Sequence, residues 1–438
     1  MDPWDVLGEA IQTAFPRGRD LLPRALVYGD DAAAQLPALL AYEAARREVL
    51  VLADVRTRAV GDAVVQALHA DGWIVHERIV ADGADGASPH CDDATKTALA
   101  IDLPPAAIIL AIGAGVINDL AKWISAEAGL PYAVFATAAS MNGYAAANVA
   151  PTIRGVKSLF RARSPRVIAA DPRVLRDAPA RMTMAGLGDV IAKPVSTGDW
   201  VMNHRLFGEP YTDAVAGIIN RVESAYLDHP AELAQGDPAA VRGLFEALVF
   251  SGCAMTLQGS SLPASGGEHL VSHTLDMMSH VDGVPHDLHG RQVGVSTILV
   301  AAMYERALAI EAPVFRAACA PYDAAFWGHL AGSVKVEHDK KVMSSQKAQQ
   351  LLAEPGRWDA LRAELGAILP PPERIKDCLR AAGAAHRIAD LGITRERYLT
   401  ALTHCGAIRG RFTSIDLAWA LGILPDAGPE LVDRWLID

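Results

Sequence analysis

Residues 108–123 read IILAIGAGVINDLAKW, which is an apolar run followed by a glycine turn and an amphipathic stretch. A short apolar run that ends at glycine is typical of a buried strand, and the spacing after the turn predicts a helix beginning near Val116. Comparable apolar runs recur before and after this stretch, at residues 25–30, 48–54, 73–80, 132–137 and 165–171. Because helical patterns lie between these runs, the sequence predicts a parallel sheet covered on both faces.

The strand pattern ends after Asp171. Alanine and leucine then recur at helical spacing in residues 241–257, 294–310, 347–365 and 413–424. A chain of 438 residues is also too long for one ordinary core. We therefore expect an α/β N-terminal nucleotide-binding domain with a parallel sheet over residues 1–175, plus an all-α C-terminal domain over residues 176–438. The active site is expected in the cleft between them.

Composition narrows the class of protein. The formal net charge is -11 and no lysine- or arginine-rich run is present, which argues against a nucleic-acid partner. The first residues, MDPWDVLGEA, lack the pattern of a secretory signal, and the apolar runs noted above are shorter than the ~20 residues of a membrane span. Five scattered cysteines without a CxxC pair favour a reduced compartment. We expect a cytoplasmic protein without membrane insertion.

The glycine turn is a candidate phosphate site. Gly113 and Gly115 allow close approach of a phosphate, and a helix that starts there offers free N–H groups. For a lone Gly-x-Gly, a turn without any ligand is the more frequent case. Asn118 also occupies the third glycine position of the usual dinucleotide fingerprint. Asp54 ends an earlier strand and could bind an adenosine ribose, favouring NAD over NADP, or could merely cap a helix beginning at Thr57.

A loop of small residues follows the next predicted strand. Residues 136–148 read ATAASMNGYAAAN. Small side chains would admit a flat ring or a phosphate, with hydrogen bonds from Thr137, Ser140 and Asn142. The same residues could instead form a tight turn bent at Asn142 and Gly143. Both interpretations stay open.

Residues 266–294, GGEHLVSHTLDMMSHVDGVPHDLHGRQVG, hold five of the 14 histidines. His269 and His273 are four residues apart, so on a helix they share one face and could chelate a divalent metal. The pattern HExxH is absent, because Glu268 precedes the first histidine. His289 opens a further predicted helix, and a third ligand would most simply be a carboxylate. A metal or proton-transfer site and ordinary surface or core histidines are both compatible with the window.

Several blocks in this chain resemble a known family. They are GAGVINDLAK, TAAS, RVIAADPRVL, AGLGDVIAK, SGCAMTLQGSSLPASGGEHLVSH, LHGRQVGV and AIRGRFTSIDLA. In this order they resemble sn-glycerol-1-phosphate dehydrogenases and their bacterial counterparts, members of the iron-containing alcohol dehydrogenase and dehydroquinate synthase superfamily. The resemblance runs from about residue 28 to residue 421. It implies a nucleotide-binding domain, a helical domain that binds metal and substrate, and a homodimer.

The resemblance also implies roles for the histidine window. Asp189, His269 and His289 would hold one divalent metal, which would be zinc, nickel or iron. His273 would line the substrate pocket and relay a proton, and Asp189 would also face substrate. His280 and His286 match no functional position, so they are expected on the surface.

For the cofactor, the resemblance implies NAD(H) or NADP(H), with NAD favoured by Asp54. The residues that would approach the pyrophosphate are Gly113, Gly115, Val116, Ile117, Asn118 and Asp119. Thr137 and Ser140 would lie on the nicotinamide side.

The sequence departs from the family at three positions. Asn142, in Met-Asn-Gly, stands where archaeal relatives have the Asp of a His-Asp-Gly run, so the identity of the substrate is open. Val116 and Ala146 stand where relatives have serines, which would remove hydrogen bonds to cofactor worth ~1 kcal/mol each. The leading reaction is reduction of dihydroxyacetone phosphate to sn-glycerol 1-phosphate.

Asn142 and Lys157 are the further substrate candidates, with Arg154 and Arg291 also considered for the phosphate; a cation of this kind is more often solvated or ion-paired than bound to a ligand. Alternatives are a dehydrogenase of another polyol, aldehyde or phosphonate, a dehydroquinate-synthase-like cyclase, and an idle nucleotide-binding protein. Asp189 argues against the cyclase, which uses a glutamate ligand.

Overall fold

The computed structural model describes residues 20–83, 86 and 88–438. The expectation drawn from the first residues, that no secretory signal is present, falls outside this range. Contacts group the chain into two compact units. The first runs to Gly186 and also includes Gly217–Ser260, and the second comprises Leu187–Ala216 and Ser261–Asp438. The functional domains 1–175 and 176–438 stay a prediction.

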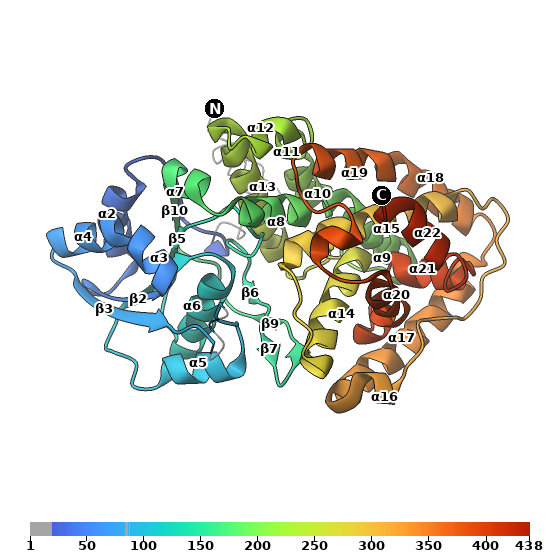
Figure 1. The fold of residues 1–438 in the computed structure, drawn as a ribbon, viewed down its shortest axis with the longest axis horizontal. Helices are drawn as coiled ribbons and strands as arrows, with labels where there is room; N and C mark the ends of the chain where they lie inside the picture. The colour runs from blue at the N-terminus through green and yellow to red at the C-terminus, as the bar shows by residue number, and fades with distance from the viewer. Residues whose placement is uncertain (1–19, 84–85, 87) are drawn as a thin grey trace. The chain divides into compact units, whose positions relative to one another are not determined.

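The first unit contains the predicted parallel sheet, shown by the blue to green strands of Figure 1. Its strands are β1 (Ala25–Tyr28), β2 (Glu48–Asp54), β3 (Ile74–Val80), β4 (Ile108–Gly113), β5 (Tyr132–Ala136) and β10 (Val167–Ala170). Their order is β1-β10-β5-β4-β2-β3, and every neighbouring pair is parallel. All six predicted strands are confirmed.

Helices cover both faces of this sheet, as a parallel sheet requires. Val49, Val51 and Ala53 share a buried cluster with apolar residues of α2 (Ala32–Glu43) and α4 (Asp62–Ala70). The intervening Leu50 and Leu52 are also buried, and side chains alternate between faces along a strand. Helix α6 (Gly115–Ala128) packs on β4 with its buried face. The near-continuous apolar runs of the strands follow from burial on both sides.

The remaining elements of the first unit include two departures from expectation. The helical pattern that follows the apolar run 48–54 is divided at Gly61 into two helices, α3 (Val55–Val60) and α4, and a Cβ on Gly61 would lie 2.6 Å from Ile112 Cγ2. Two antiparallel pairs were not predicted, β6 (Asn148–Val149) with β9 (Phe160–Arg161) and β7 (Thr152–Ile153) with β8 (Val156–Lys157). The other helices are α5 (Asp93–Ala100), α7 (Pro172–Asp177), α11 (Ser224–Leu227), α12 (Pro230–Ala234) and α13 (Pro238–Gln258).

Helix α13 is the one helix among the described residues that is long and apolar enough to cross a membrane. However, 78% of its apolar window is buried inside the protein. A core helix has the same length and composition. We therefore assign α13 to the core of the first unit, where Gly252 lets it approach the backbone of Asn142 and Ala146.

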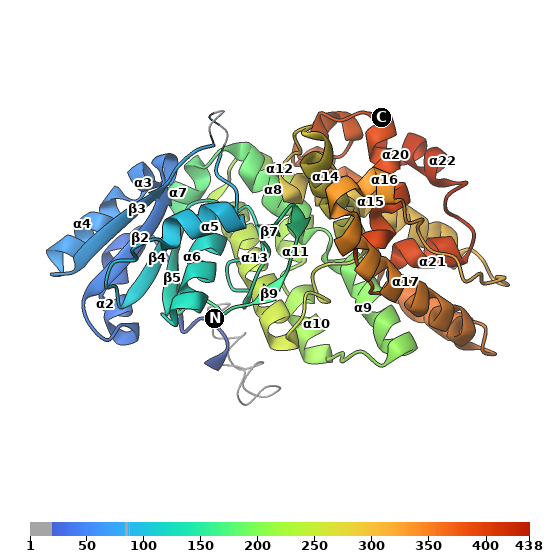
Figure 2. The ribbon, with the colours of Figure 1, turned by 90° about the horizontal axis from the view of Figure 1, so that it is seen from below.

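The second unit is helical, as predicted, and no strand occurs in its described residues (Figure 2). Its helices are α9 (Lys193–Phe207), α14 (Gly267–Asp282), α15 (His289–Leu308), α16 (Ala324–Trp327), α17 (Ala331–Leu352), α18 (Arg357–Ile368), α19 (Pro372–Ala381), α20 (Arg395–His404), α21 (Ser414–Ala420) and α22 (Gly428–Leu436). Short 3-10 turns occur at Gly328–Leu330, Ile388–Leu391 and Cys405–Ile408. Helices α8 (Ala180–Val190) and α10 (Asp213–Asn220) carry the chain from one unit to the other.

Candidate functional site

Three histidines of the window meet in the second unit. His269 and His273 lie on α14, and His289 is the first residue of α15, as the sequence predicted. The ring centroid of His289 lies 5.2 Å from that of His269 and 5.1 Å from that of His273. His280 and His286 are exposed, which agrees with their expected place on the surface.

Asp189, near the end of α8, joins this group from a distant part of the chain. Its carboxylate and one ring nitrogen each of His269 and His289 all lie within 4.8 Å of one another. Gly188 explains the close approach, because a Cβ there would lie 2.1 Å from the carbonyl oxygen of Gly290. One carboxylate and two imidazoles are a suitable donor set for a divalent metal such as zinc. The residues therefore fit the metal that the resemblance implies, and their role as ligands stays a prediction.

Lys193 neutralises the charge of Asp189 and was missed by the sequence analysis. Its Nζ lies 3.1 Å from Asp189 Oδ1 and 3.1 Å from the carbonyl oxygen of Ala264, with both charged side chains buried. Burial by itself would favour the neutral acid, but the ammonium group of Lys193 holds the pKa of Asp189 far below its usual range. The carboxyl group is thus ionised, which is the form that binds a metal. The available signal was the spacing of four residues in GLGDVIAK.

Glu268 orients the ring of His269. Its Oε1 accepts hydrogen bonds from the backbone N–H of Gly266 at 2.7 Å and from His269 Nδ1 at 2.7 Å. With Nδ1 donating to the carboxylate, Nε2 of the same ring carries the lone pair, and it lies 3.7 Å from Asp189 Oδ1. A carboxylate behind a metal-binding imidazole is a common arrangement for fixing its tautomer. The sequence analysis noted Glu268 only because HExxH is absent.

A second buried carboxylate, Asp199 on α9, lies behind Glu268. It accepts hydrogen bonds from the backbone N–H groups of Gly267 and Ser414, each at 2.7 Å, and from Tyr304 Oη. Burial and the neighbouring Glu268 raise the pKa of Asp199 to about 7. A Cβ on Gly266 would lie 2.4 Å from Asp199 Oδ2, so the glycine pair before Glu268 is needed for this packing.

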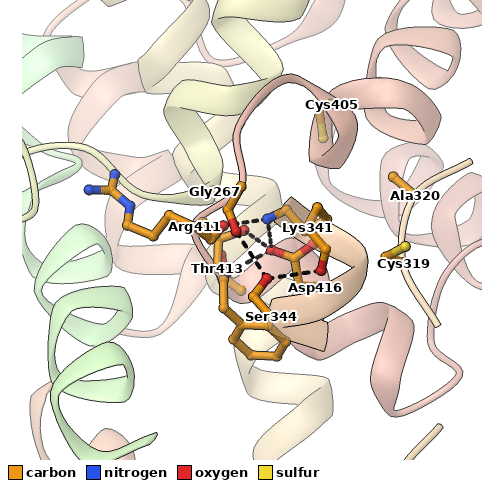
Figure 3. Close-up of polar contacts among 12 residues, drawn as sticks. Gly267, Cys319, Ala320, Lys341, Ser344, Cys405, Arg411, Thr413 and Asp416 are labelled. Carbon is orange, nitrogen blue, oxygen red and sulfur yellow. Dashed lines mark hydrogen bonds and ion pairs between the residues drawn. The ribbon is translucent and has the colours of Figure 1, made fainter. Parts of the chain in front are cut away.

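The segment that carries Ser414 is held by a fully buried ion pair, shown in Figure 3. Lys341 Nζ on α17 donates to Asp416 Oδ2 and to the carbonyl oxygen of Arg411. Thr413 donates to the same carboxylate through its backbone N–H at 2.7 Å and its hydroxyl at 2.9 Å. A Cβ on Gly267 would lie 2.3 Å from Ser414 Oγ, so this segment packs directly on the start of α14. The ion pair thereby supports the helix that carries His269.

In the first unit, the glycine turn joins the end of β4 to the start of α6. Strand β4 ends at Gly113, Ala114 caps α6, and Gly115 begins the helix with a φ of +36°. A Cβ on Gly113 would lie 2.6 Å from Ile117 Cβ, whereas a Cβ on Gly115 would meet nothing within 4 Å. Because Ala114 has no polar side chain, no side chain caps the N–H groups of this helix. A phosphate is a suitable partner for such groups.

Asp54 acts as a helix cap. Its Oδ1 accepts hydrogen bonds from the backbone N–H groups of Arg56 at 2.9 Å and Thr57 at 2.7 Å. The capped helix, α3, begins at Val55 rather than at Thr57. The capping interpretation of Asp54 is therefore confirmed. Its role toward a ribose stays a prediction.

Lys122 stabilises the loop of small residues by hydrogen bonds to its backbone. Its fully buried Nζ donates to the carbonyl oxygens of Gly143 at 2.6 Å and Asn148 at 3.1 Å, and lies 3.6 Å from Asp119 Oδ1. Thr137 is buried at the other end of this loop. Asn142, Ser140, Val116 and Asp119 are partly exposed, while Ile117 and Asn118 are buried.

The three cationic phosphate candidates differ in their surroundings. Lys157 in β8 is half-buried. Burial of the Cys91 thiol raises the pKa of that thiol, and the positive charge of Lys157 partly offsets this increase. Arg154 has a φ of +50° in the turn between β7 and β8. Arg291, on α15, pairs with Asp287 at 2.6 Å, so the ion-pair interpretation applies to it.

Comparison with known proteins places the chain in a family. The model of the family described as "Iron-containing alcohol dehydrogenase" matches residues 27–179. The chain is 31% identical over 392 residues to a protein of Halalkalibacterium halodurans named glycerol-1-phosphate dehydrogenase [NAD(P)+], covering 89% of this chain and 90% of that protein. It is 28% identical over 393 residues to a protein of the same name from Bacillus velezensis, covering 90% of each.

The fold is also found among solved structures. A probable glycerol dehydrogenase from Sinorhizobium meliloti 1021 superimposes with a TM-score of 0.60 at 18% identity, over 93% of this chain and 98% of that one. At this identity the likeness concerns the fold alone. The sequence relatives, which are matched over nine-tenths of their length, decide the family. The chain belongs to the glycerol-1-phosphate dehydrogenase family of the iron-containing alcohol dehydrogenases.

Proposed function

We propose that the protein is a metal-dependent dehydrogenase that uses NAD(P)H to reduce a small phosphorylated ketone, with dihydroxyacetone phosphate as the leading substrate and sn-glycerol 1-phosphate as the product. The observation that carries this proposal is the convergence of Asp189, His269 and His289. The names of the relatives that cover nine-tenths of the chain support it.

In this proposal Asp189, His269 and His289 hold zinc, nickel or iron. The ion, when bound, would supply Lewis-acid polarisation of the substrate carbonyl. Lys193 keeps the Asp189 carboxyl group ionised, and Glu268 keeps Nε2 of His269 available. His273, whose ring is stacked on that of His289 with an interplanar angle of 13°, holds or passes on the proton that the product oxygen needs.

The cofactor-binding residues are proposed in the first unit. NAD(P)H supplies the hydride. Gly113, Gly115 and the first turn of α6 would bind its pyrophosphate through backbone N–H groups, and Thr137 and Ser140 would contact the nicotinamide side. Asp54 would favour NAD over NADP, because its charge would repel a 2′-phosphate.

The substrate is the least constrained part of the proposal. Asn142 can donate and accept hydrogen bonds but carries no charge. This departure from the family Asp makes a dehydrogenase of another polyol, aldehyde or phosphonate the second candidate. Lys157 is the proposed partner of the phosphate. The homodimer that the resemblance implies and the cytoplasmic location that the composition favours also stay predictions.

Purified protein loaded with zinc, nickel or iron should oxidise NADH in the presence of dihydroxyacetone phosphate and much more slowly with dihydroxyacetone. Lys157→Ala should raise KM for the phosphorylated ketone and leave that for the unphosphorylated one unchanged. If no ketone or aldehyde in a panel of phosphorylated and unphosphorylated compounds consumes NADH with any of the three metals, the dehydrogenase proposal fails.

A matched pair of variants tests the metal ligands separately from activity. His289→Ala should abolish retention of one zinc ion per chain after dialysis, while His286→Ala should retain it. Metal analysis measures both. Equal retention by the two variants would show that His289 is not a ligand.

A further inference from the structure

His289 lies between two possible sets of metal ligands. Its ring is about as far from the ring of His273 as from that of His269, at 5.1 and 5.2 Å. On α14, Asp276 continues the same helical face, seven residues after His269 and three after His273. One ligand atom each of His273, Asp276 and His289 lie within 4.8 Å of one another, as in the set formed with Asp189. Both sets consist of one carboxylate and two imidazoles.

The second set is enclosed and pre-positioned. His273 and Asp276 are only 9% and 6% exposed. Asp276 Oδ1 accepts a hydrogen bond from Gln292 Nε2 at 2.8 Å, and His286 Nδ1 lies 3.1 Å from the same oxygen. Such partners orient a carboxylate without occupying both of its oxygens.

The two sets differ in the group that is paired with their carboxylate. Asp189 is paired with the ammonium group of the buried Lys193. The ion-pair partner that the structure records for Asp276 is an imidazole, that of His286. A divalent cation beside Asp189 would therefore lie close to an ammonium group, whereas the partner recorded beside Asp276 is a further imidazole.

We propose that His273, Asp276 and His289 form a second position for a divalent cation, about one helical turn along α14 from the first. His289 Nδ1 lies 3.0 Å from Ser272 Oγ, so Nε2 serves both positions. An ion at the second position withdraws His289 from the first and blocks His273. Excess zinc therefore inhibits the enzyme; this consequence rests on the proposed function, whereas binding of the ion does not.

Cobalt binding to the metal-free chain tests the second position directly. In His269→Ala, which breaks the first set, we expect one Co²⁺ per chain by equilibrium dialysis, with visible absorption typical of nitrogen and oxygen ligands. Adding Asp276→Asn should weaken this binding at least tenfold. Asp282→Asn, in the last turn of the same helix, is the matched control and should bind as His269→Ala does. If the Asp276 and Asp282 changes have equal effects, the proposal is wrong.

A second measurement covers the case in which His269→Ala does not fold, as judged by circular dichroism. Asp189→Asn, which breaks the first set without changing α14, should then bind one Zn²⁺ per chain, and adding Asp276→Asn should weaken that binding at least tenfold. Identical zinc isotherms would overturn the proposal. Asp276-dependent binding in a protein that reduces no carbonyl would refute the proposed function and leave the second position standing.

Discussion

The two units use buried lysines in different ways. In the first unit, Lys122 donates to two backbone carbonyl groups, and burial lowers its pKa. In the second unit, Lys341 is paired with the fully buried carboxylate of Asp416. The first lysine supports a loop by satisfying backbone oxygens, whereas the second compensates a charge that could not otherwise be buried. The hydrogen bonds of Lys122 thus go to backbone oxygens, whereas Lys341 also has a carboxylate partner that is as deeply buried as itself.

The largest expected effect follows from removing each lysine. Lys341→Met should lower the free energy of unfolding by about 3–5 kcal/mol, because it leaves the Asp416 carboxylate buried without its cation. Lys122→Met should cost only about 1–3 kcal/mol, the range for unsatisfied buried polar groups. Urea denaturation measures both values.

Lys335→Met provides the control for this comparison. Lys335 pairs with Asp339 on the exposed face of α17, and such a pair contributes about 0–1 kcal/mol. If Lys122→Met destabilises the protein as much as Lys341→Met does, the proposed difference between the units is wrong.

A smaller effect is expected at the carboxylate behind His269. Glu268→Gln should weaken zinc binding by about 10–100-fold, because a neutral amide no longer fixes the ring with Nδ1 as donor. Competition with a chelating dye measures the dissociation constant. Unchanged affinity would mean that Glu268 has only a packing role.

Two substitutions of Asp54 distinguish its role as a helix cap from a role in cofactor binding. Asp54→Ala should destabilise the protein by about 1 kcal/mol, whereas Asp54→Asn should not, since asparagine caps equally well. Both variants should lose preference for NAD over NADP, which binding titrations with the two cofactors can measure. A preference unchanged in Asp54→Asn would leave Asp54 as a cap alone.

The last expected effect is a change in how stability depends on pH, rather than a single difference in free energy. Asp199 has a pKa of about 7 in the folded protein, against about 3.9 for an unfolded aspartate. Between these values the folded state holds the extra proton, so the contribution of Asp199 to stability declines as pH rises and is lost once pH passes about 7. In Asp199→Asn the free energy of unfolding should fall less steeply between pH 5 and 7, and equal slopes in urea denaturation would contradict this assignment.

The sequence determined the local elements of this protein. Apolar runs on both faces predicted all six parallel strands, because a doubly covered sheet has no polar side. The helical spacing around His269 and the start of a helix at His289 were equally visible, since both depend on neighbours along the chain. The need for glycine at position 61 was not visible, because it depends on the approach of Ile112 from a different element.

Only the tertiary structure decided which polar groups meet. Spacing on one helix predicted that His269 and His273 could bind a metal together. The packing of α14 and α15 also places His289 beside both of them. Asp189 reaches His269 from 80 residues away through the contact of Gly188 with Gly290. Glu268 and Asp199 had no distinguishing sequence pattern, because their function depends on burial and on the charges opposite them. Local periodicity records which face of an element is apolar, whereas a buried polar network is determined by how several elements pack together.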